Sequence, residues 1–472
     1  MITACACNGN TEQKPSATPA PSQGTTEAPV DESLVNSIPG EVYMKPGDTY
    51  RIYLYHLDKQ ETLEERYNKS TVRDELDIAK GQAMREKYGI DMVFTPWQGS
   101  YFTEYCAAAA SGIPLADILY TVGPHTMSQL YMWDGVAGSA MLPLSDYEHA
   151  YKFDNPEFWD VDSQDARCYY NGKLYFAVPR LIGDNIVNLH QYTFYNKSIL
   201  SSAGYEPETM TQLAKDGNWN WDKFKEIAIA TNNPDKYVYA LVTAQENALV
   251  NNLMASNGGD YFKKKEVNGV MVDRFTGNEE EAIEAWDFFM DLAKANLIMP
   301  QSMGGEDIMF RNGMVAMMLT HLNRSDTYKD YPELEFGILP IPKAPDAESY
   351  VSPLSWFMPY GVFKNVQNPE GVVQFAGLFL APVYAMNSNE NMMLLRSELD
   401  SRLGDADSVQ FALDALEYTV PSNTLVYQTV CADVLWYATE SFINGEKTPK
   451  EHFDAVADQI NYKIDEYNGI SD

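Results

Sequence analysis

The first part of the folded chain alternates apolar stretches of two kinds. Some repeat apolar residues at every second position, as a half-buried strand does, and others repeat them at helical spacing. The pattern predicts strands at 50–57, 90–96 and 116–122, and helices at 70–89 and 100–112. Strands that alternate with helices in this way are typical of a parallel sheet with right-handed crossovers. Ligands of such sheets bind at the carboxyl ends of the strands.

The remainder of the chain departs from this simple order. A strand-like segment at 172–179 is followed by a block rich in Trp and Tyr, with amphipathic helices predicted within 211–232 and 279–298. Within the first of these helices, we expect Ile229 to lie on the apolar face. A second set of strands is predicted at 314–321 and 336–342, ahead of further helices that complete the chain. No segment of about 20 to 50 residues repeats, which argues against a solenoid or a propeller.

Composition places the chain among large globular proteins. Its 472 residues are 45% hydrophobic and 12% aromatic, which is enough for a large core spread over two or three domains. The chain has 34 Lys and Arg against 67 Asp and Glu, a formal charge of -33. This charge repels a nucleic-acid backbone or an anionic membrane surface, so we expect neither as a direct partner. No segment reaches the roughly 20 uninterrupted apolar residues that span a bilayer.

The N-terminus carries a pattern of its own. Ile2-Thr3-Ala4-Cys5 resembles a bacterial lipobox, in which the cysteine is lipidated after signal cleavage. A run rich in Pro, Thr, Ser, Gln and Glu follows, and it is too poor in large apolar side chains to fold. A chance match of four residues is the alternative. We expect Cys5 to carry a lipid anchor and residues 1–40 to form the lipobox and a disordered tether, as in a Gram-positive lipoprotein.

The other cysteines give no sign of a chemical role. Apart from Cys7, they are Cys106, Cys168 and Cys431, which are far apart and odd in number. This spacing matches neither a disulfide framework nor a zinc site. We expect these three as small buried hydrophobic residues, and we expect no metal and no cofactor.

Six short patterns carry a family resemblance, and each is a weak signal alone. In order they are AAAASGIPLADILYT, LPLSDY, YYNGKLYFAVP with TFYNKSILSSAGYEPET, FRNGMVAMMLTH, FGILPIPKAP and KNVQNPEGVVQFAGLF. Together they resemble the family-one extracellular solute-binding proteins, the maltodextrin-binding type that serves bacterial ABC sugar importers. The resemblance runs from about Tyr50 to the C-terminus.

The resemblance implies an α/β fold of the two-lobe, periplasmic-binding-protein-like type (type II). It also implies a ligand cleft between the lobes and crossing segments that join them. The first crossing is expected within PRLIGDNIVN and the second near SPLSWF. A long insertion between Val178 and Tyr195 sets the chain apart from smaller members. The implied boundaries are 41–178 and 353–415 for the N-terminal lobe, and 179–352 and 416–472 for the C-terminal lobe.

A cleft for a neutral sugar needs aromatic planes for the ring faces and polar groups for the hydroxyls. Loop positions at the predicted strand ends and crossings give the candidates for ligand contact: Tyr55, Asp58, Thr121, Arg180, Asp184, Asn257, His321 and Trp356.

Several of these candidates could instead have a purely structural role. Trp356 is favoured as a stacking residue, because an indole in a Ser/Pro-rich crossing has little sheet to cover. His321 is equally consistent with a satisfied structural histidine. Asp58 is also a possible turn cap, and Arg180 is also a possible structural partner of Asp184.

These observations predict an extracellular lipoprotein that captures a carbohydrate, expected to be an oligosaccharide, and delivers it to the permease of an ABC transporter. We expect a monomer at the outer face of the cell membrane that contacts the membrane only through its anchor. A surface sensor or adhesin that uses the same cleft is an open alternative. A carbohydrate-active enzyme is less favoured, because the chain has no nucleophile elbow, His-Glu-x-x-His or phosphate-binding loop motif.

Overall fold

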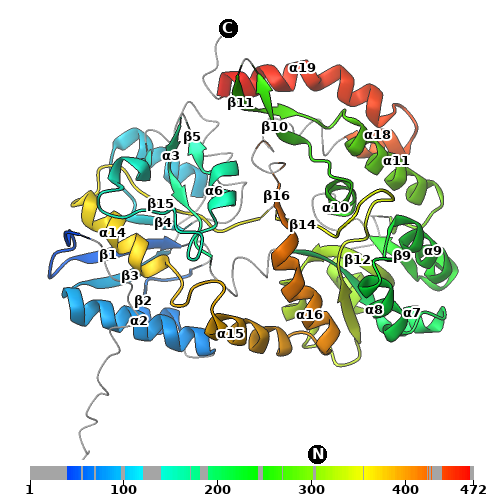
Figure 1. Cartoon of the computed structure of the whole chain (residues 1–472), viewed down its shortest axis with the longest axis horizontal. Helices are drawn as coiled ribbons and strands as arrows, with labels where there is room; N and C mark the ends of the chain where they lie inside the picture. The colour runs from blue at the N-terminus through cyan, green and yellow to red at the C-terminus, as the bar shows by residue number, and fades with distance from the viewer. Residues whose placement is uncertain are drawn as a thin grey trace, which may run out of the picture.

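The structure is a computed structural model, and each of its two α/β lobes has its own sheet and core (Figure 1). A short linking sheet lies between the lobes. The two-lobe α/β architecture expected from the sequence is therefore confirmed. In the described part of the chain, no helix is long and apolar enough to cross a membrane. The structure describes residues 40–54, 57–68, 71–96, 101–120, 140–170, 172–180, 190–242, 248–267, 269–300, 305–354, 356–422, 424, 427 and 438–467.

The sheet of the first lobe contains the three strands predicted near the start of the fold. Its order is β2-β3-β1-β4-β15-β7. β1 pairs in parallel with both β3 and β4, whereas β15 runs antiparallel to β4 and β7. The strands are β1 (Thr49–Leu54), β2 (Glu61–Thr62), β3 (Asp91–Pro96), β4 (Ile118–Tyr120), β7 (Phe176–Ala177) and β15 (Tyr360–Val362).

Helices pack around this sheet at the predicted positions. The helix expected at 70–89 forms from Val72, with Thr71 as its N-cap, and ends at Gly89 in a left-handed conformation with φ of 67°. The helical elements of this lobe are α1 (Leu63–Arg66), α2 (Val72–Tyr88), α3 (Tyr101–Ser111), η2 (Leu144–Tyr147), α6 (Val161–Arg167) and α14 (Pro369–Leu380). A small antiparallel pair, β5 (Tyr169–Tyr170) and β6 (Lys173–Leu174), follows α6.

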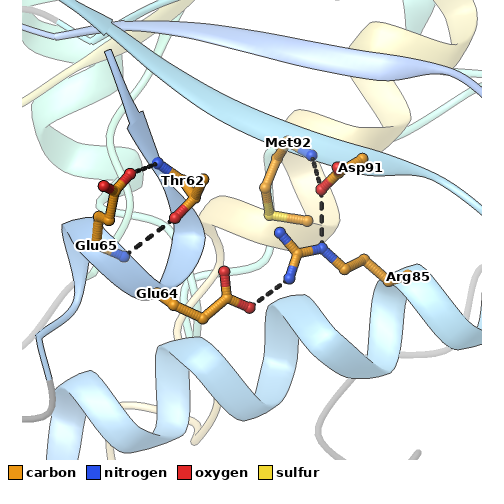
Figure 2. A network of polar contacts seen from close by, with 6 residues as sticks. All are labelled: Thr62, Glu64, Glu65, Arg85, Asp91 and Met92. Carbon is orange, nitrogen blue, oxygen red and sulfur yellow. Dashed lines mark hydrogen bonds and ion pairs between the residues drawn. The ribbon is translucent and has the colours of Figure 1, made fainter. Parts of the chain in front are cut away.

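One arginine ties three neighbouring elements of the first lobe together (Figure 2). Arg85 of α2 pairs with Glu64 of α1 at 2.5 Å and with Asp91 of β3 at 2.8 Å. Thr62 and Glu65 form a capping box at the start of α1. Every contact of Arg85 described here stays inside the first lobe.

The second lobe is built on a four-stranded sheet of order β13-β8-β12-β9. Alternate residues of β12 face opposite sides, so that Met317 and Leu319 join one hydrophobic cluster and Met318 joins another. The strand β8 was not predicted, because all six of its residues are buried and no alternation marks it. The strands are β8 (Gln191–Asn196), β9 (Tyr239–Val242), β12 (Val315–His321) and β13 (Phe336–Leu339).

Helices cover both faces of the second sheet. The segment expected as a helix within 211–232 forms two, separated near Gly217, whose φ is 68°. Ile229 is 58% exposed, contrary to the prediction, because Ala228 occupies the buried face beside Phe224. The elements on one side are α7 (Lys197–Ser202), α8 (Pro207–Lys215), α9 (Trp221–Thr231), α10 (Ala248–Ser256), α11 (Glu280–Lys294), α18 (Ala438–Ile443) and α19 (Pro449–Tyr467).

The other side of the second sheet carries helices from two distant parts of the chain. These are α12 (Glu306–Arg311), α13 (Arg324–Tyr328), α15 (Asn389–Asp400) and α16 (Ala406–Asp414). A hairpin of β10 (Phe262–Val267) and β11 (Val270–Phe275) packs beside α19 (Figure 1). Short turns of 3-10 helix lie at η3 (Pro234–Lys236) and η6 (Ala415–Tyr418).

The implied lobe boundaries differ from the packing after residue 386. Residues 353–415 are expected in the first lobe, and α14 does pack there. Leu395 of α15 and Val409 of α16 instead lie in a hydrophobic cluster with Phe194 of the second sheet. Their apolar faces are buried by β8 and β13, so the chain crosses back to the second lobe before α15.

A parallel pair of short strands joins the lobes. β14 (Ser352–Leu354) pairs with β16 (Thr419–Pro421), and the pair lies between the two lobes in Figure 1. The second predicted crossing, near SPLSWF, includes β14. Most of the first predicted crossing lies outside the described residues.

Candidate functional site

A pocket lies where the linking sheet meets the second lobe. Its cavity is about 40 Å³. A buried water needs roughly 10–15 Å³ of such volume, so the pocket as it stands fits a few hydroxyl-sized groups. Its lining comes from β8, α10, the turn before β10, the end of β12 and both linking segments. The residues are Gln191, Ala248, Asn251, Asn252, Met254, Ala255, Gly259, Asp260, Tyr261, His321, Pro353, Trp356, Ser422 and Thr424.

An aromatic corner formed by two predicted residues lines this pocket. The rings of His321 and Trp356 meet edge to face, with centroids 6.2 Å apart. Nε2 of His321 is buried and has no hydrogen-bond partner among the described residues. Burial, together with a smaller effect of the nearby Arg324, lowers the pKa of His321 to about 3. The imidazole is therefore neutral near pH 7 and can exchange a hydrogen bond with a hydroxyl group.

Polar side chains opposite the aromatic corner are held by hydrogen bonds. Oδ1 of Asp260 accepts from Oγ1 of Thr424 at 2.6 Å. Nδ2 of Asn252 donates to Oε1 of Gln191 at 3.2 Å, and the backbone N–H of Gln191 donates to Oγ of Ser352 at 3.1 Å. These bonds connect α10 and β8 to the linking segments, so the polar wall of the pocket depends on how the lobes are joined.

The charges of the pocket favour a neutral ligand. Asp260 supplies a carboxylate, and the described lining contains no lysine or arginine. Within this lining a ligand phosphate or carboxylate would meet an acidic group and no basic one; Arg167, which does not line the pocket, interacts electrostatically with Asp260. Aromatic rings beside amides and a carboxylate suit a ligand with apolar faces and many hydroxyl groups.

A second hollow lies at the carboxyl ends of β1 and β4 in the first lobe. Tyr120 and Tyr360 stack there with ring centroids 4.4 Å apart. Arg66, Arg73 and Asp77 also line the hollow, whose cavity is about 60 Å³. Parallel sheets bind ligands at this edge. The predicted residues Tyr55 and Thr121, which directly follow β1 and β4, lie outside the described residues.

The other predicted residues are placed away from the pocket. Asn257 does not line it, because Nδ2 donates to the carbonyl of Glu281 at 3.0 Å and to Oε2 of Glu284 at 2.8 Å. Asp58 is exposed. Nε of Arg180 donates to the carbonyl of Trp159 at 3.1 Å, within the first lobe.

Two further predictions fall where the structure describes nothing. Asp184, an expected ligand contact, and Cys5, the expected lipid anchor, lie outside the described residues. Where the chain is described, no group of three or more His, Cys, Asp or Glu side chains could hold a metal ion.

Most of the polar residues that line the pocket are not among the predicted ligand contacts. Asp260 lies three residues after the predicted Asn257, and the turn at Gly258 and Gly259 brings the carboxylate rather than the amide into the pocket. Asn251 and Asn252 are adjacent polar residues inside an otherwise apolar helix, a signal that was available in the sequence. Nothing in the local sequence marks Thr424.

Comparisons with known proteins agree with this architecture. A substrate-binding protein of an ABC transporter from Listeria monocytogenes, solved with cycloalternan, is 18% identical with a TM-score of 0.62, covering 88% of this chain and 99% of that one. The cyclic alpha-maltosyl-1,6-maltose binding protein of Arthrobacter globiformis is 15% identical with a TM-score of 0.64, covering 89% and 99%. UgpB of Mycobacterium tuberculosis, solved with glycerophosphocholine, is 15% identical with a TM-score of 0.58, covering 89% and 99%.

These identities are low enough that the structures establish the fold alone. A search of curated proteins finds no match. The model of the family described as bacterial extracellular solute-binding protein matches residues 68–386, which is more than half of the 472 residues. The protein therefore belongs to the bacterial extracellular solute-binding protein family.

Proposed function

We propose that this protein captures a neutral carbohydrate, expected to be an oligosaccharide, and delivers it to the permease of an ABC transporter. The observation that carries the proposal is the pocket at the lobe junction, which Trp356, His321 and Asp260 all line and where the two rings are in contact. An indole matches the apolar face of a pyranose ring, and the polar wall matches its hydroxyl groups.

The ligands of similar structures support a sugar over a phosphate-bearing ligand. Solved relatives are described with cycloalternan, maltotetraose and maltose, and one is described with glycerophosphocholine. The described lining of this pocket offers Asp260 and no cation. We infer that a neutral glycan binds here, because the described lining offers aromatic faces and hydrogen-bonding groups rather than a basic side chain.

The two-lobe form supports capture by closure. Ligands of such proteins sit between lobes that close by hinge motion, and the linking pair β14–β16 is the segment that must bend. In our proposal the lobes are 41–178 and 353–385, and 190–352 and 386–472. The first-lobe hollow beside Tyr120 would then supply the opposite wall of the site, together with Tyr55, Thr121 and Asp184.

The proposal includes anchoring and excludes catalysis. We infer that Cys5 holds the protein at the outer face of the cell membrane through a lipid, and that residues 1–40 act as its tether. The protein would work as a monomer, with no cofactor and no metal. Solved relatives are described as a substrate-binding protein and a sugar-binding protein, which supports a non-enzymatic role.

A ligand panel tests the proposal. Maltose, maltotetraose, cycloalternan and glycerophosphocholine are titrated by calorimetry and by thermal shift. A ligand that binds only the folded state adds about 2.7 kcal/mol of stability at a hundredfold excess over its Kd. We expect a glycan to bind and glycerophosphocholine not to bind. Binding of glycerophosphocholine alone would overturn the carbohydrate assignment.

Delivery needs a separate test. In a strain that takes up the bound glycan, loss of this protein should stop uptake, and the restored gene should recover it. Growth and uptake that continue without the protein would instead favour a sensing role for the same pocket.

A further inference from the structure

A buried arginine of the first lobe lies at the lobe junction. Arg167, the last residue of α6, is only 2% exposed. Burying a guanidinium is costly unless hydrogen bonds satisfy it, so the contacts of this residue decide its role.

Arg167 reaches both linking segments. Nη1 donates to the carbonyl of Leu354, the last residue of β14, at 2.7 Å, and makes a longer contact of 3.5 Å with the carbonyl of Ser422, just beyond β16. Nη2 donates to Oγ of Ser163 at 2.6 Å. The guanidinium also lies over the ring of Phe357, 3.9 Å from its centroid. One side chain therefore holds the ends of two crossing strands.

The first lobe fixes the position of this side chain. The side chain of Asp160 caps α6 by accepting from the backbone N–H of Ser163 at 3.1 Å. Ser163 and Arg167 are four residues apart and so share one face of the helix. Arg167 itself stays charged: burial lowers its pKa to about 10, while the carboxylates of Asp160 and Asp260 oppose that shift.

The pocket residues follow directly after the points that Arg167 holds. Trp356 comes two residues after Leu354, and Thr424 comes two residues after Ser422. Thr424 in turn donates to Asp260, which also lines the pocket. We propose that Arg167 is a positioning residue: by tying the ends of β14 and β16 to the first lobe, it sets Trp356 and Thr424 around the ligand and fixes the resting angle between the lobes. The effect on ligand contact rests on the proposed function.

A lysine would not reproduce this geometry. A lysine ammonium is a point charge on a flexible stem, whereas the guanidinium donates through separate nitrogens in a fixed plane. Arg85 is the matched control, because its two ion pairs stay within the first lobe (Figure 2).

The test uses Arg167→Met, Arg167→Lys, the milder Ser163→Ala, and Arg85→Met in the full chain. Small-angle X-ray scattering without ligand reports the separation of the lobes, and calorimetry with maltotetraose reports affinity. We expect Arg167→Met to increase the radius of gyration and weaken maltotetraose binding roughly tenfold or more. Arg167→Lys should have a radius of gyration and an affinity between those of Arg167→Met and the wild type. Ser163→Ala should change both quantities in the same direction as Arg167→Met, but by less. Arg85→Met should lower the melting temperature and leave the scattering curve unchanged.

The outcomes separate the two proposals. An Arg167→Met protein that folds and scatters like the wild type would overturn the positioning role, as would an equal change in Arg85→Met. If Arg167→Met does not fold, Ser163→Ala and Arg167→Lys decide by the same scattering comparison. Failure of the wild type to bind any glycan overturns the carbohydrate assignment, while the scattering result still decides the role of Arg167.

Discussion

The rings of His321 and Trp356 meet at 86° with centroids 6.2 Å apart, although 34 residues and a complete crossing between the lobes separate them in sequence. The histidine ends a strand of the second sheet, and the tryptophan follows the linking strand β14. Their contact forms the pocket at the junction between the lobes. Substitutions at this junction are therefore expected to weaken ligand binding more than they destabilise the two hydrophobic cores.

Replacing Trp356 with alanine tests whether the indole stacks on the ligand. We expect Trp356→Ala to weaken glycan binding at least several-fold, since stacking contributes about 1 kcal/mol beyond area burial. The unliganded protein should melt nearly as the wild type does, because the indole is only half-buried. Calorimetry and thermal melts measure the two quantities, and Tyr462→Ala, a change to an exposed residue of α19, is the control. A loss of about 3 to 5 kcal/mol in stability would identify Trp356 as a core residue instead.

Asn257 should behave in the opposite way. Its side-chain amide bonds to Glu281 and Glu284, so Asn257→Ala removes contacts that join the turn after α10 to α11. We expect a loss of about 1 kcal/mol in the free energy of unfolding and no change in glycan affinity. Urea unfolding and calorimetry give the answer. Weaker glycan binding at an unchanged free energy of unfolding would instead identify Asn257 as a ligand contact.

The stability of the protein should depend on two histidines: His190, which is buried, and His321, which is half-buried with its Nε2 shielded from solvent. Burial lowers the pKa of His190 to about 4 and that of His321 to about 3, from 6.5. Between these values and 6.5 the unfolded chain binds more protons than the folded one, so stability rises with pH and is lost as the pH falls. Each histidine contributes at most about 1.4 kcal/mol per pH unit in this window.

Urea midpoints across this pH range measure that dependence. His190→Gln and His321→Gln should each flatten the loss of stability below pH 6.5. His190 also lies 2.9 Å from Oγ1 of Thr419 at the start of β16, so its replacement is expected to lower stability at neutral pH too. A slope identical to the wild type in both variants would show that neither histidine is buried as described.

The lipid anchor is tested at Cys5. Expressed behind a lipoprotein signal peptide, the protein should fractionate with the membrane, and Cys5→Ala should release it, since we propose this thiol as the site of lipid attachment. Cys7→Ala is the matched control and should remain in the membrane fraction. Equal partitioning of all three proteins would contradict the anchor.

No hydrolysis of a bound glycan is expected. The described lining of the pocket contains Asp260 as its one carboxylate beside a neutral histidine, whereas glycosidases place two carboxyl groups roughly 5 to 10 Å apart. Prolonged incubation with maltotetraose at high protein concentration, followed by product chromatography, measures cleavage. New reducing ends that disappear in Asp184→Asn or Asp260→Asn would reverse this assignment.

The first sheet was readily predicted because its signals are local. β1, β3 and β4 carry short apolar runs between helices with clear caps, and Gly89 marks a left-handed helix end. By contrast, β8 is buried on both faces and has no alternation to detect. The periodicity of α9 placed Ile229 on the wrong face because a small residue, Ala228, fills the buried position instead.

Pocket residues could be predicted from the sequence only where a single residue was conspicuous in its local context. Trp356 stood out because a large indole in a short crossing has few places to pack. Asp260 did not stand out, because an acidic chain offers many carboxylates and only the turn at Gly258 and Gly259 selects this one. Arg167 has no sequence signal at all, since its partners are carbonyls about 190 and 255 residues away.

The place of β15 in the first sheet has a consequence for biosynthesis. This strand lies between β4 and β7, yet it follows the whole of the second sheet along the chain. Until residues 360–362 leave the ribosome, β4 and β7 present open edges to one another and to other chains. Neither lobe is a contiguous unit that can fold as it emerges, so the nascent protein depends on late, long-range pairing. A chain with this order of strands is well suited to export before it folds, because the sheet of its first lobe cannot be completed until most of the chain has been synthesised.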